Sequence, residues 1–245
     1  AGADKLGLGE MDYDDPERIH QYVEILRRTY ADRNLLLGDP DFVDVPMGEL
    51  LSPAWVASRR ASIGEFARVD VAPWAAPTPP ESTETTHVSV VDRDGNALSM
   101  TTTLNGRFGS GILVEGGGFL LNNELDDFAI QQDAPNMYGL VGSSANVIAP
   151  GKRPLSSMTP TVVRTADGRP ELVLGSPGGP RIITSVVQVA LRVLVLDQDL
   201  RAAVDAPRLH QQWRPRENWF EADFHGGWDP VLLDALEDRG HPLEV

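Results

Sequence analysis

The sequence predicts an α+β fold, because patterns typical of helices occupy both ends of the chain and patterns typical of strands occupy its middle. The first helix is expected over DDPERIHQYVEILRRTYADR, residues 14–33. Asp14 or Asp15 is placed to cap it, and Pro16 takes its first position, where the missing N–H removes no helical hydrogen bond. Its apolar residues recur at helical spacing: Ile19, Tyr22, Val23, Leu26 and Tyr30.

A loop, GDPDFVDVP, and a second helix follow. The second helix is expected in LLSPAWVASRRASIGEF, with Ser52 as its cap and Pro53 at its start. The segment DVAPWAAPTPPESTE, residues 70–84, is rich in proline and is expected to be extended and exposed. This change of composition is the clearest boundary in the chain.

Two hairpins are expected after that boundary. THVSVVD and ALSMTTTL alternate as strands do, and DRDGN between them suits a tight turn, because Asp94-Gly95 tolerates positive φ angles. The signal DGR joins a second pair of strands, TPTVVRT and ELVLGS. A glycine-rich turn at 116–118 and a long polar loop from 122 to about 154 separate the hairpins. Three helices are expected in PRIITSVVQVALRVLVL, DLRAAVDAPR and WDPVLLDALEDRG.

Composition excludes several classes of protein. A net charge of −15 repels phosphate backbones, so nucleic acid is a poor partner. The absence of cysteine excludes disulfides, thiolate catalysis and cysteine zinc sites. No run reaches the roughly 18 uncharged apolar residues of a membrane-spanning helix, so a soluble protein is expected. The first residues, AGADKLGLGEMDYDDPE, show no signal-peptide pattern, so the chain is expected to be a fragment or a processed product.

Thr85 is a candidate nucleophile at the entrance of the first hairpin. A two-residue turn at Asp94-Gly95 sets Thr85 opposite Leu104, and a three-residue loop sets it opposite Asn105; in either register Thr103 and Asn105 lie beside it. Threonine is also common in strands for packing alone. His87 faces the same side but lies two residues along, so a base is missing. Cleavage before Thr85 would supply one, because a free α-amine has a pKa of about 7.7 to 8.0.

Three further segments carry groups suited to binding an acyl substrate. GSPGG, residues 175–179, lies between a strand and a helix, where backbone N–H groups can face an oxyanion, although such turns are often only structural. Ser156 and Ser157 can hold a carboxylate or merely cap a turn. The acidic group Glu124, Asp126 and Asp127 can hold an ammonium or a metal, or can be a solvated turn.

These segments together resemble a known family. TTHVSVVDRDGNALSMTTTLN, FGSGI, LLNNELDDF, PNMYGLVG, PGKRPLSSMTPT and GSPGGPRIIT occur in the order and at the spacing found in the small catalytic subunit of the γ-glutamyltransferases, also called γ-glutamyltranspeptidases or glutathione hydrolases. RTYADRNLLLGDPDFVDVP resembles the C-terminal end of that family's large subunit. The resemblance implies an N-terminal nucleophile hydrolase with an αββα sandwich. It divides the chain into residues 1–84, the end of the large subunit, and 85–245, a small subunit that stops short of the family's last strands.

The resemblance also implies roles for individual residues. The precursor would cleave itself between Glu84 and Thr85, and Thr85 would then be the nucleophile, its own amine the base and Thr103 its support. Gly178 and Gly179 would form the oxyanion hole. Asn105, Glu124 and Asp127 would bind the substrate ammonium, and Ser156 with Ser157 its carboxylate. Tyr138 would belong to the lid over the substrate. No cofactor or metal is implied.

The predicted activity is hydrolysis of glutathione and other γ-glutamyl amides, with transfer of the acyl group to water, amino acids or peptides. The expected partner is the rest of the large subunit, which in the family supplies an arginine for the substrate carboxylate, and the expected location is periplasmic or secreted. One alternative is a related acylase, acting on cephalosporins or poly-γ-glutamate. The other is an inactive truncated fragment that only binds a partner.

Overall fold

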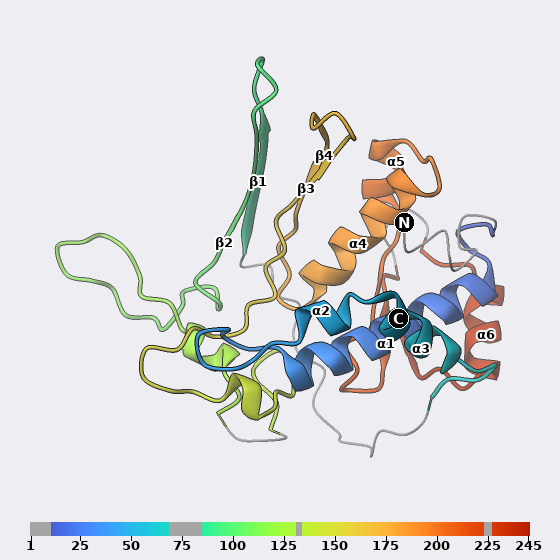
Figure 1. Cartoon of the computed structure of the whole chain (residues 1–245), viewed down its shortest axis with the longest axis horizontal. Coiled ribbons are helices and arrows are strands. Elements are labelled where there is room, and N and C mark those ends of the chain that lie inside the picture. Colours follow the sequence, from blue (N-terminus) through green and yellow to red (C-terminus); the bar gives the residue numbers. More distant parts are fainter. Residues whose placement is uncertain (1–10, 69–84, 131–133, 223–226) are drawn as a thin grey trace. The chain divides into compact units, whose positions relative to one another are not determined.

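The structure, a computed structural model, describes residues 11–68, 85–130, 134–222 and 227–245 (Figure 1). Its contacts divide the chain into two compact units, residues 1–76 with 188–245 and residues 77–187. The predicted proline-rich linker at 70–84, including Glu84, lies outside the described residues. The division at the Glu84–Thr85 bond therefore remains a prediction.

The first unit is built around a long helix, α1, at Pro16–Leu36. Of the two predicted caps the structure uses Asp15, whose carboxylate accepts a hydrogen bond of 2.8 Å from the backbone N–H of Glu17. The predicted apolar face is buried against α6 and the strands of this unit, in a cluster that includes Ile19, Leu26 and Leu236. The other elements of the unit are α2 (Met47–Leu50), α3 (Pro53–Ala61), α5 (Leu200–Asp205), α6 (Pro230–Asp238), β5 (Leu209–His210), β6 (Asn218–Phe220) and β7 (Leu243–Glu244).

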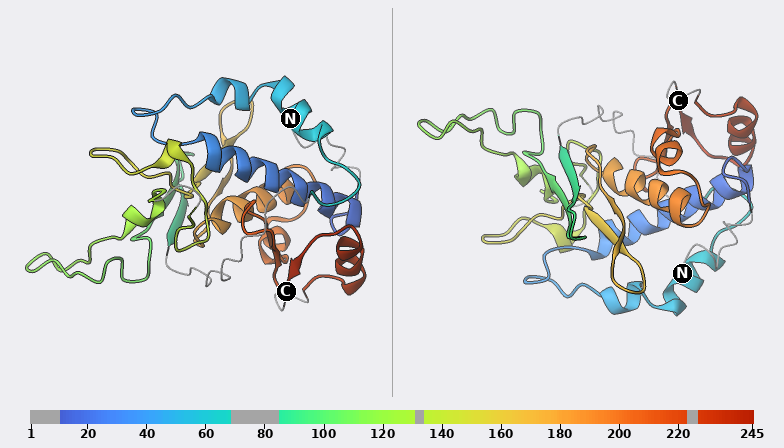
Figure 2. Two further views of the ribbon diagram at one scale, coloured as in Figure 1. Left: turned by 90° about the horizontal axis from the view of Figure 1, so that it is seen from below. Right: turned by 90° about the horizontal axis from the view of Figure 1, so that it is seen from above.

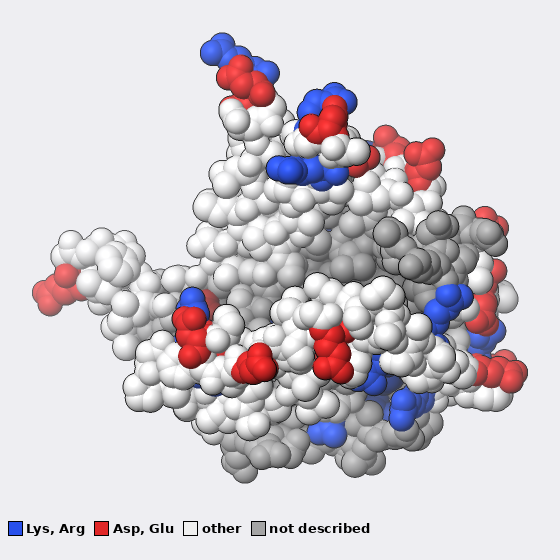
Figure 3. All heavy atoms as spheres, in the orientation of Figure 1, with Lys and Arg blue, Asp and Glu red and all other residues white. Residues whose placement is uncertain are grey.

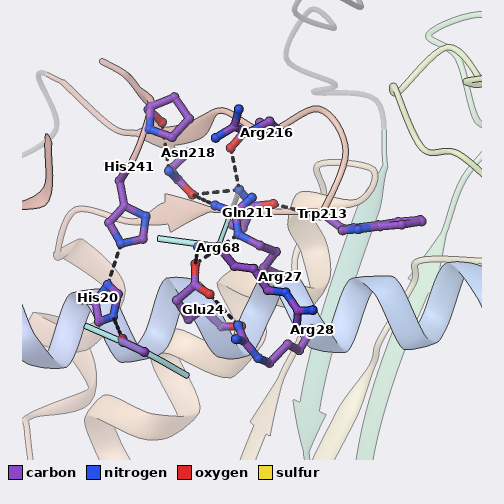
Figure 4. Close-up of polar contacts among 12 residues, drawn as sticks. His20, Glu24, Arg27, Arg28, Arg68, Gln211, Trp213, Arg216, Asn218 and His241 are labelled. Carbon is purple, nitrogen blue, oxygen red and sulfur yellow. Dashed lines mark hydrogen bonds and ion pairs between the residues drawn. The ribbon is translucent and has the colours of Figure 1, made fainter. Parts of the chain in front are cut away.

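The strands β5, β6 and β7 form a three-stranded sheet that the sequence patterns did not predict. Polar groups of α1 are buried beneath it (Figure 4). Glu24 is fully buried and accepts hydrogen bonds from Arg27 and Arg28. Burial opposes the ionisation of Glu24, but the hydrogen bond from Arg28 and the positive charges of Arg27 and Arg28 outweigh it and lower its pKa. The helix is therefore buried on its polar side as well as its apolar side.

The second unit contains the two predicted hairpins, which lie side by side, with β1 and β2 both close to β4 (Figures 1 and 2). The first hairpin is β1 (Thr86–Val91) with β2 (Ala97–Thr102), and the second is β3 (Thr161–Arg164) with β4 (Pro170–Leu174). From β4 the chain passes through the glycine-containing turn into α4 (Arg181–Leu194), a helix that continues into the first unit.

The predicted register of the first hairpin is wrong. Val91 pairs with Ala97 and Thr86 with Thr102. The same register, extended by one residue, places Thr85 opposite Thr103 rather than opposite Leu104 or Asn105. The cause lies in the loop, where the Asp92 carboxylate accepts the backbone N–H groups of Asp94 and Asn96, at 2.9 and 2.8 Å. These bonds close the hairpin at the Asp92–Asn96 pair.

Charged side chains lie at the tips of both hairpins of the second unit (Figure 3). The first tip carries Asp92, Arg93 and Asp94, and the second carries Asp167 and Arg169. Within the strands, one side of the first hairpin carries four exposed apolar side chains, those of Val88, Val90, Leu98 and Met100. Thr85 and His87 belong to the opposite side. Among the described residues, no helix is both long and apolar enough to span a bilayer.

Candidate active site

Thr85 lies at the buried end of the first hairpin. It is 7% exposed, whereas its neighbour Thr86 is exposed on the other side of the strand. The Thr85 hydroxyl forms a hydrogen bond of 3.2 Å with the hydroxyl of Thr103. The Thr103 oxygen also accepts the backbone N–H of Asn105, at 3.0 Å. Thr103 is thus fixed by the backbone and can orient the Thr85 hydroxyl.

A small pocket surrounds this pair. It is lined by eight of the ten residues to which the sequence assigned a catalytic or substrate-binding role, namely Thr85, Thr103, Asn105, Asp127, Tyr138, Ser156, Ser157 and Gly179. Met158, Pro180 and Ile182 complete its wall. Glu124 and Gly178 are not among its lining residues, although Glu124 begins the same short 3-10 helix (Glu124–Asp127) as Asp127 and Gly178 precedes Gly179. The pocket is small and is open to solvent.

Asn105 occupies a strained position at the end of the hairpin. Its φ is +69°, in the left-handed region that asparagine tolerates better than most residues, and it is 3% exposed. Its side-chain Nδ2 donates to the carbonyl of Asn123, at 3.2 Å, and lies 3.7 Å from the sulfur of Met137. The donor side of the amide is thus used by the protein, and the Oδ1 acceptor is the part suited to an ammonium group.

Tyr138 covers this residue and the glycine turn. Its hydroxyl donates to the backbone carbonyl of Asn105, at 2.7 Å, and its side chain is buried. Its ring lies against Gly179, where a β-carbon would be only 3.1 Å from two ring carbons. Gly179 has a φ of +54° and Gly178 a φ of +124°, so both positions favour glycine.

The glycine turn is also the entrance to α4. The carbonyls of Gly178 and Gly179 accept the backbone N–H groups of Arg181 and Ile182, at 3.0 and 3.1 Å. The N–H groups of the turn therefore lie at the positive end of the helix dipole, an arrangement that favours a negative oxygen. The oxyanion hole that the resemblance implies at Gly178 and Gly179 remains a prediction.

The acidic and hydroxyl groups predicted to bind substrate lie on loops. The carbonyl of Asp127 accepts a hydrogen bond of 2.7 Å from Asn146, which fixes its backbone, and the Ser156 hydroxyl accepts the backbone N–H of Met158, at 3.1 Å. Asp126, in the same acidic group, accepts the backbone N–H of Met137, at 3.0 Å, so it supports the loop that leads to Tyr138. Among the described residues, no three of His, Asp and Glu are grouped as a metal site would require.

Sequence reasoning missed Met137, Met158 and Asn123 as parts of the site. Met158 follows the serine pair directly, so the motif LSSM contained its signal. The contacts of Asn123 and Met137 with Asn105 join residues 18 and 32 positions apart, which no local pattern reports.

Comparisons with known proteins identify the family of the chain. A family model described as gamma-glutamyltranspeptidase matches residues 2–245. The glutathione hydrolase proenzyme of Pseudomonas sp. (strain A14) is 46% identical over 216 residues, covering 88% of this chain and 37% of that protein. The proenzyme of Escherichia coli (strain K12) is 44% identical over 249 residues, covering 98% of this chain and 40% of the relative. The chain thus spans about two fifths of the length of these curated relatives.

Solved structures point the same way. The structure of Helicobacter pylori gamma-glutamyltranspeptidase, in mutant form, superposes with a TM-score of 0.61 at 48% identity, covering 65% of this chain and 83% of the other. A cephalosporin acylase from Bacillus halodurans superposes over all of this chain and 42% of its own, with a TM-score of 0.74 at 24% identity, a likeness that concerns the fold alone. These neighbours confirm the predicted fold class, that of the N-terminal nucleophile hydrolases. The chain belongs to the gamma-glutamyltranspeptidase family.

Proposed function

We propose that this chain contains the self-cleavage site and most of the catalytic site of a γ-glutamyl hydrolase and transferase that acts on glutathione and related γ-glutamyl amides. The observation that carries the proposal is the Thr85–Thr103 hydroxyl pair, 3.2 Å apart, in one pocket with Asn105, Asp127 and Gly179. Such a pocket offers a nucleophile, an acceptor for an ammonium and donors for an oxyanion, which are the groups that transfer of a γ-glutamyl unit requires.

Cleavage of the Glu84–Thr85 bond, which consumes one water, would create the base. In the intact chain the Thr85 nitrogen is an amide and cannot accept a proton. After cleavage it is an amine with a reference pKa of about 7.7 to 8.0, so near neutral pH a substantial fraction can take the proton of the adjacent hydroxyl.

Acyl transfer then follows in two steps, acylation of Thr85 and deacylation of the ester. The Thr85 oxygen attacks the γ-carbonyl, its proton passes through the amine to the departing nitrogen, and a γ-glutamyl ester forms. Water or an acceptor amine attacks the ester, gives a proton to the Thr85 oxygen and releases glutamate or a new amide. In both steps the tetrahedral oxyanion would accept hydrogen bonds from the N–H groups of Gly178 and Gly179, each worth roughly 3 to 4 kcal/mol.

Selectivity would come from the α-amino acid end of the substrate. Asn105, Glu124 and Asp127 would hold its ammonium, and Ser156 and Ser157 its carboxylate. Hydrogen bonds to charged groups contribute about 1.5 to 3 kcal/mol, so the ammonium site should favour a γ-glutamyl over a glutaryl substrate by about 10- to 100-fold.

This difference tests the function. The complete polypeptide that carries residues 1–245 is assayed for aniline release from γ-glutamyl anilide and from glutaryl anilide, which lacks the ammonium. We expect Thr85→Ala to abolish release, and Asp127→Asn to reduce the preference for the γ-glutamyl compound. Glutaryl anilide cleaved as fast as γ-glutamyl anilide would favour the acylase alternative, and no release from either would favour the inactive fragment.

Two parts of the proposal rest on the family likeness. The rest of the large subunit is the expected partner, testable by co-purification of the two chains after cleavage. A periplasmic or secreted location is expected too, and fractionation that leaves the protein in the cytoplasm would refute it.

A further inference from the structure

The polar side of the first hairpin carries more than the nucleophile. Alternate residues of a strand face the same side, so three cross-strand pairs share the face of Thr85. They are Thr85 opposite Thr103, His87 with Thr101, and Ser89 with Ser99. The row contains five hydroxyls and one imidazole, and the pocket described above lies at one end of it.

This row contacts the end of β4. The Ser99 hydroxyl donates to the carbonyl of Leu174, the last residue of β4, at 2.9 Å. The His87 ring lies against the next residue, Gly175, so closely that a β-carbon there would be 2.1 Å from the ring carbon Cε1. Only glycine allows the ring to approach the backbone to this extent.

The His87 ring is held by its own neighbours. Its Nδ1 lies 2.8 Å from the hydroxyl of Thr101 and its Nε2 lies 2.9 Å from the hydroxyl of Ser89. A hydroxyl can donate or accept, so these partners fit either neutral tautomer. Because both ring nitrogens are used in this way, the ring is a poor candidate for the base that activates Thr85.

Gly175 opens the turn that carries Gly178 and Gly179. We propose that His87 is a positioning residue, which braces Gly175 and so fixes the distance between the oxyanion donors and the Thr85 hydroxyl. Thr85, the nucleophile, directly precedes β1. His87, two residues later in β1, supports the turn whose N–H groups stabilise the oxyanion that the attack of Thr85 creates. The inference rests on the proposed function, and it adds a residue that touches neither substrate nor reacting atoms.

The test compares His87→Ala, Gly175→Ala and the double variant in the complete polypeptide, with γ-glutamyl anilide as substrate. Rates are divided by the concentration of chains that begin at Thr85, measured by mass spectrometry, so that incomplete self-cleavage does not lower the apparent kcat. A misplacement of about 1 Å can cost about 100-fold, so we expect each single variant to lose about 10-fold in kcat while KM stays within about 2-fold.

The double variant gives the sharper result. If the methyl group added by Gly175→Ala acts by displacing the His87 ring, it has no ring to displace in a protein that already carries His87→Ala. We therefore expect the double variant to be no more than about 2-fold slower than His87→Ala alone, a non-additive outcome typical of residues in contact. Gly48→Ala is the matched control, because a β-carbon at Gly48 meets nothing within 4 Å; it should leave kcat unchanged.

Two readouts separate positioning from general damage to the fold. A boronic acid analogue of glutamate, whose tetrahedral adduct needs the oxyanion donors, should bind His87→Ala about 10-fold more weakly. The shape of the pH–rate profile should stay the same and only its height fall, whereas loss of a base would remove a limb of the profile.

Each outcome decides the matter. A kcat of His87→Ala equal to that of the wild type, or losses in the double variant that multiply, would overturn the positioning role. If His87→Ala does not mature, Thr101→Val removes one of the two hydroxyls that hold the ring: a lower kcat, restored in Thr101→Ser, supports the role, and an unchanged kcat overturns it. A wild type that releases no aniline would instead overturn the proposed function.

Discussion

His241 should make the stability of the first unit depend on pH. Its Nε2 lies 2.7 Å from Nδ1 of His20, and Nε2 of His20 lies 2.8 Å from the carbonyl of Gly64 (Figure 4). Since a carbonyl only accepts, His20 must donate through Nε2, and in its neutral form it accepts through Nδ1. His241 therefore donates through Nε2. The nitrogen that titrates is its Nδ1, which is buried and has no hydrogen-bond partner among the described residues.

The size of the effect follows from the pKa of His241. Burial lowers this pKa from its usual value of 6.5 to about 4; the interaction with His20 and the positive charges of Arg27 and Arg239 lower it further, and Glu24 opposes them. Because the folded pKa is depressed, the unfolded chain binds more protons, and the contribution is lost as pH falls from about 6.5 towards 4. Between pH of about 7.5 and about 5 the loss amounts to about 2 kcal/mol of unfolding free energy.

The assay is urea unfolding of Thr85→Ala, expected to remain one chain, with and without His241→Gln at the two pH values. Glutamine does not titrate, and its amide can still donate to His20. The other titrating groups affect both proteins equally. Between the two pH values, the protein that keeps His241 should therefore lose about 2 kcal/mol more unfolding free energy than the His241→Gln variant. Equal losses of unfolding free energy in the two proteins would refute the claim that burial lowers the pKa of His241.

Three further substitutions have defined outcomes. Gly179→Ala forces a side chain into a φ of +54° against the ring of Tyr138 and should lower kcat for γ-glutamyl anilide by about 100-fold; a loss below about 3-fold would argue against a role in the oxyanion hole. Tyr138→Phe removes the 2.7 Å bond to the Asn105 carbonyl, costing about 1 kcal/mol, so KM should rise about 5-fold, and an unchanged KM would contradict the role of this bond. Asp32→Ala removes the acceptor shared by Trp55 and Arg59 of α3 and should cost about 2 kcal/mol in urea unfolding. The control Asp205→Ala breaks an ion pair with Arg201, whose side chain is 84% exposed, and should cost less than about 0.5 kcal/mol; equal costs would contradict the burial argument.

Local chemistry made much of the fold predictable. Asp15 with Pro16, and Ser52 with Pro53, start helices where their residue types predict, since capping depends only on the next few residues. The hairpins were also predictable, but not the register of the first, because the register depends on which backbone groups the Asp92 side chain engages. The short strands β5, β6 and β7 have no periodicity of their own and form only through pairing with distant segments.

The candidate site was predictable for a different reason. Its residues lie in motifs that resemble a family, and the structure gathers eight of the ten around one pocket. Periodicity alone gave only the proximity of Thr85, Thr103 and Asn105. The contact of His87 with Gly175 joins residues 88 positions apart, so it could be recognised only in three dimensions.

The most direct test of the account is the position at which the chain is cut. Mass spectrometry of the purified wild type, Thr85→Ala and the control Thr86→Ala locates any new N-terminus. We predict a new chain beginning at Thr85 in the wild type and in Thr86→Ala, and a single uncut chain in Thr85→Ala. A wild type that stays intact after long incubation, or a Thr85→Ala variant cut at the same bond, would contradict the claim that Thr85 is the nucleophile.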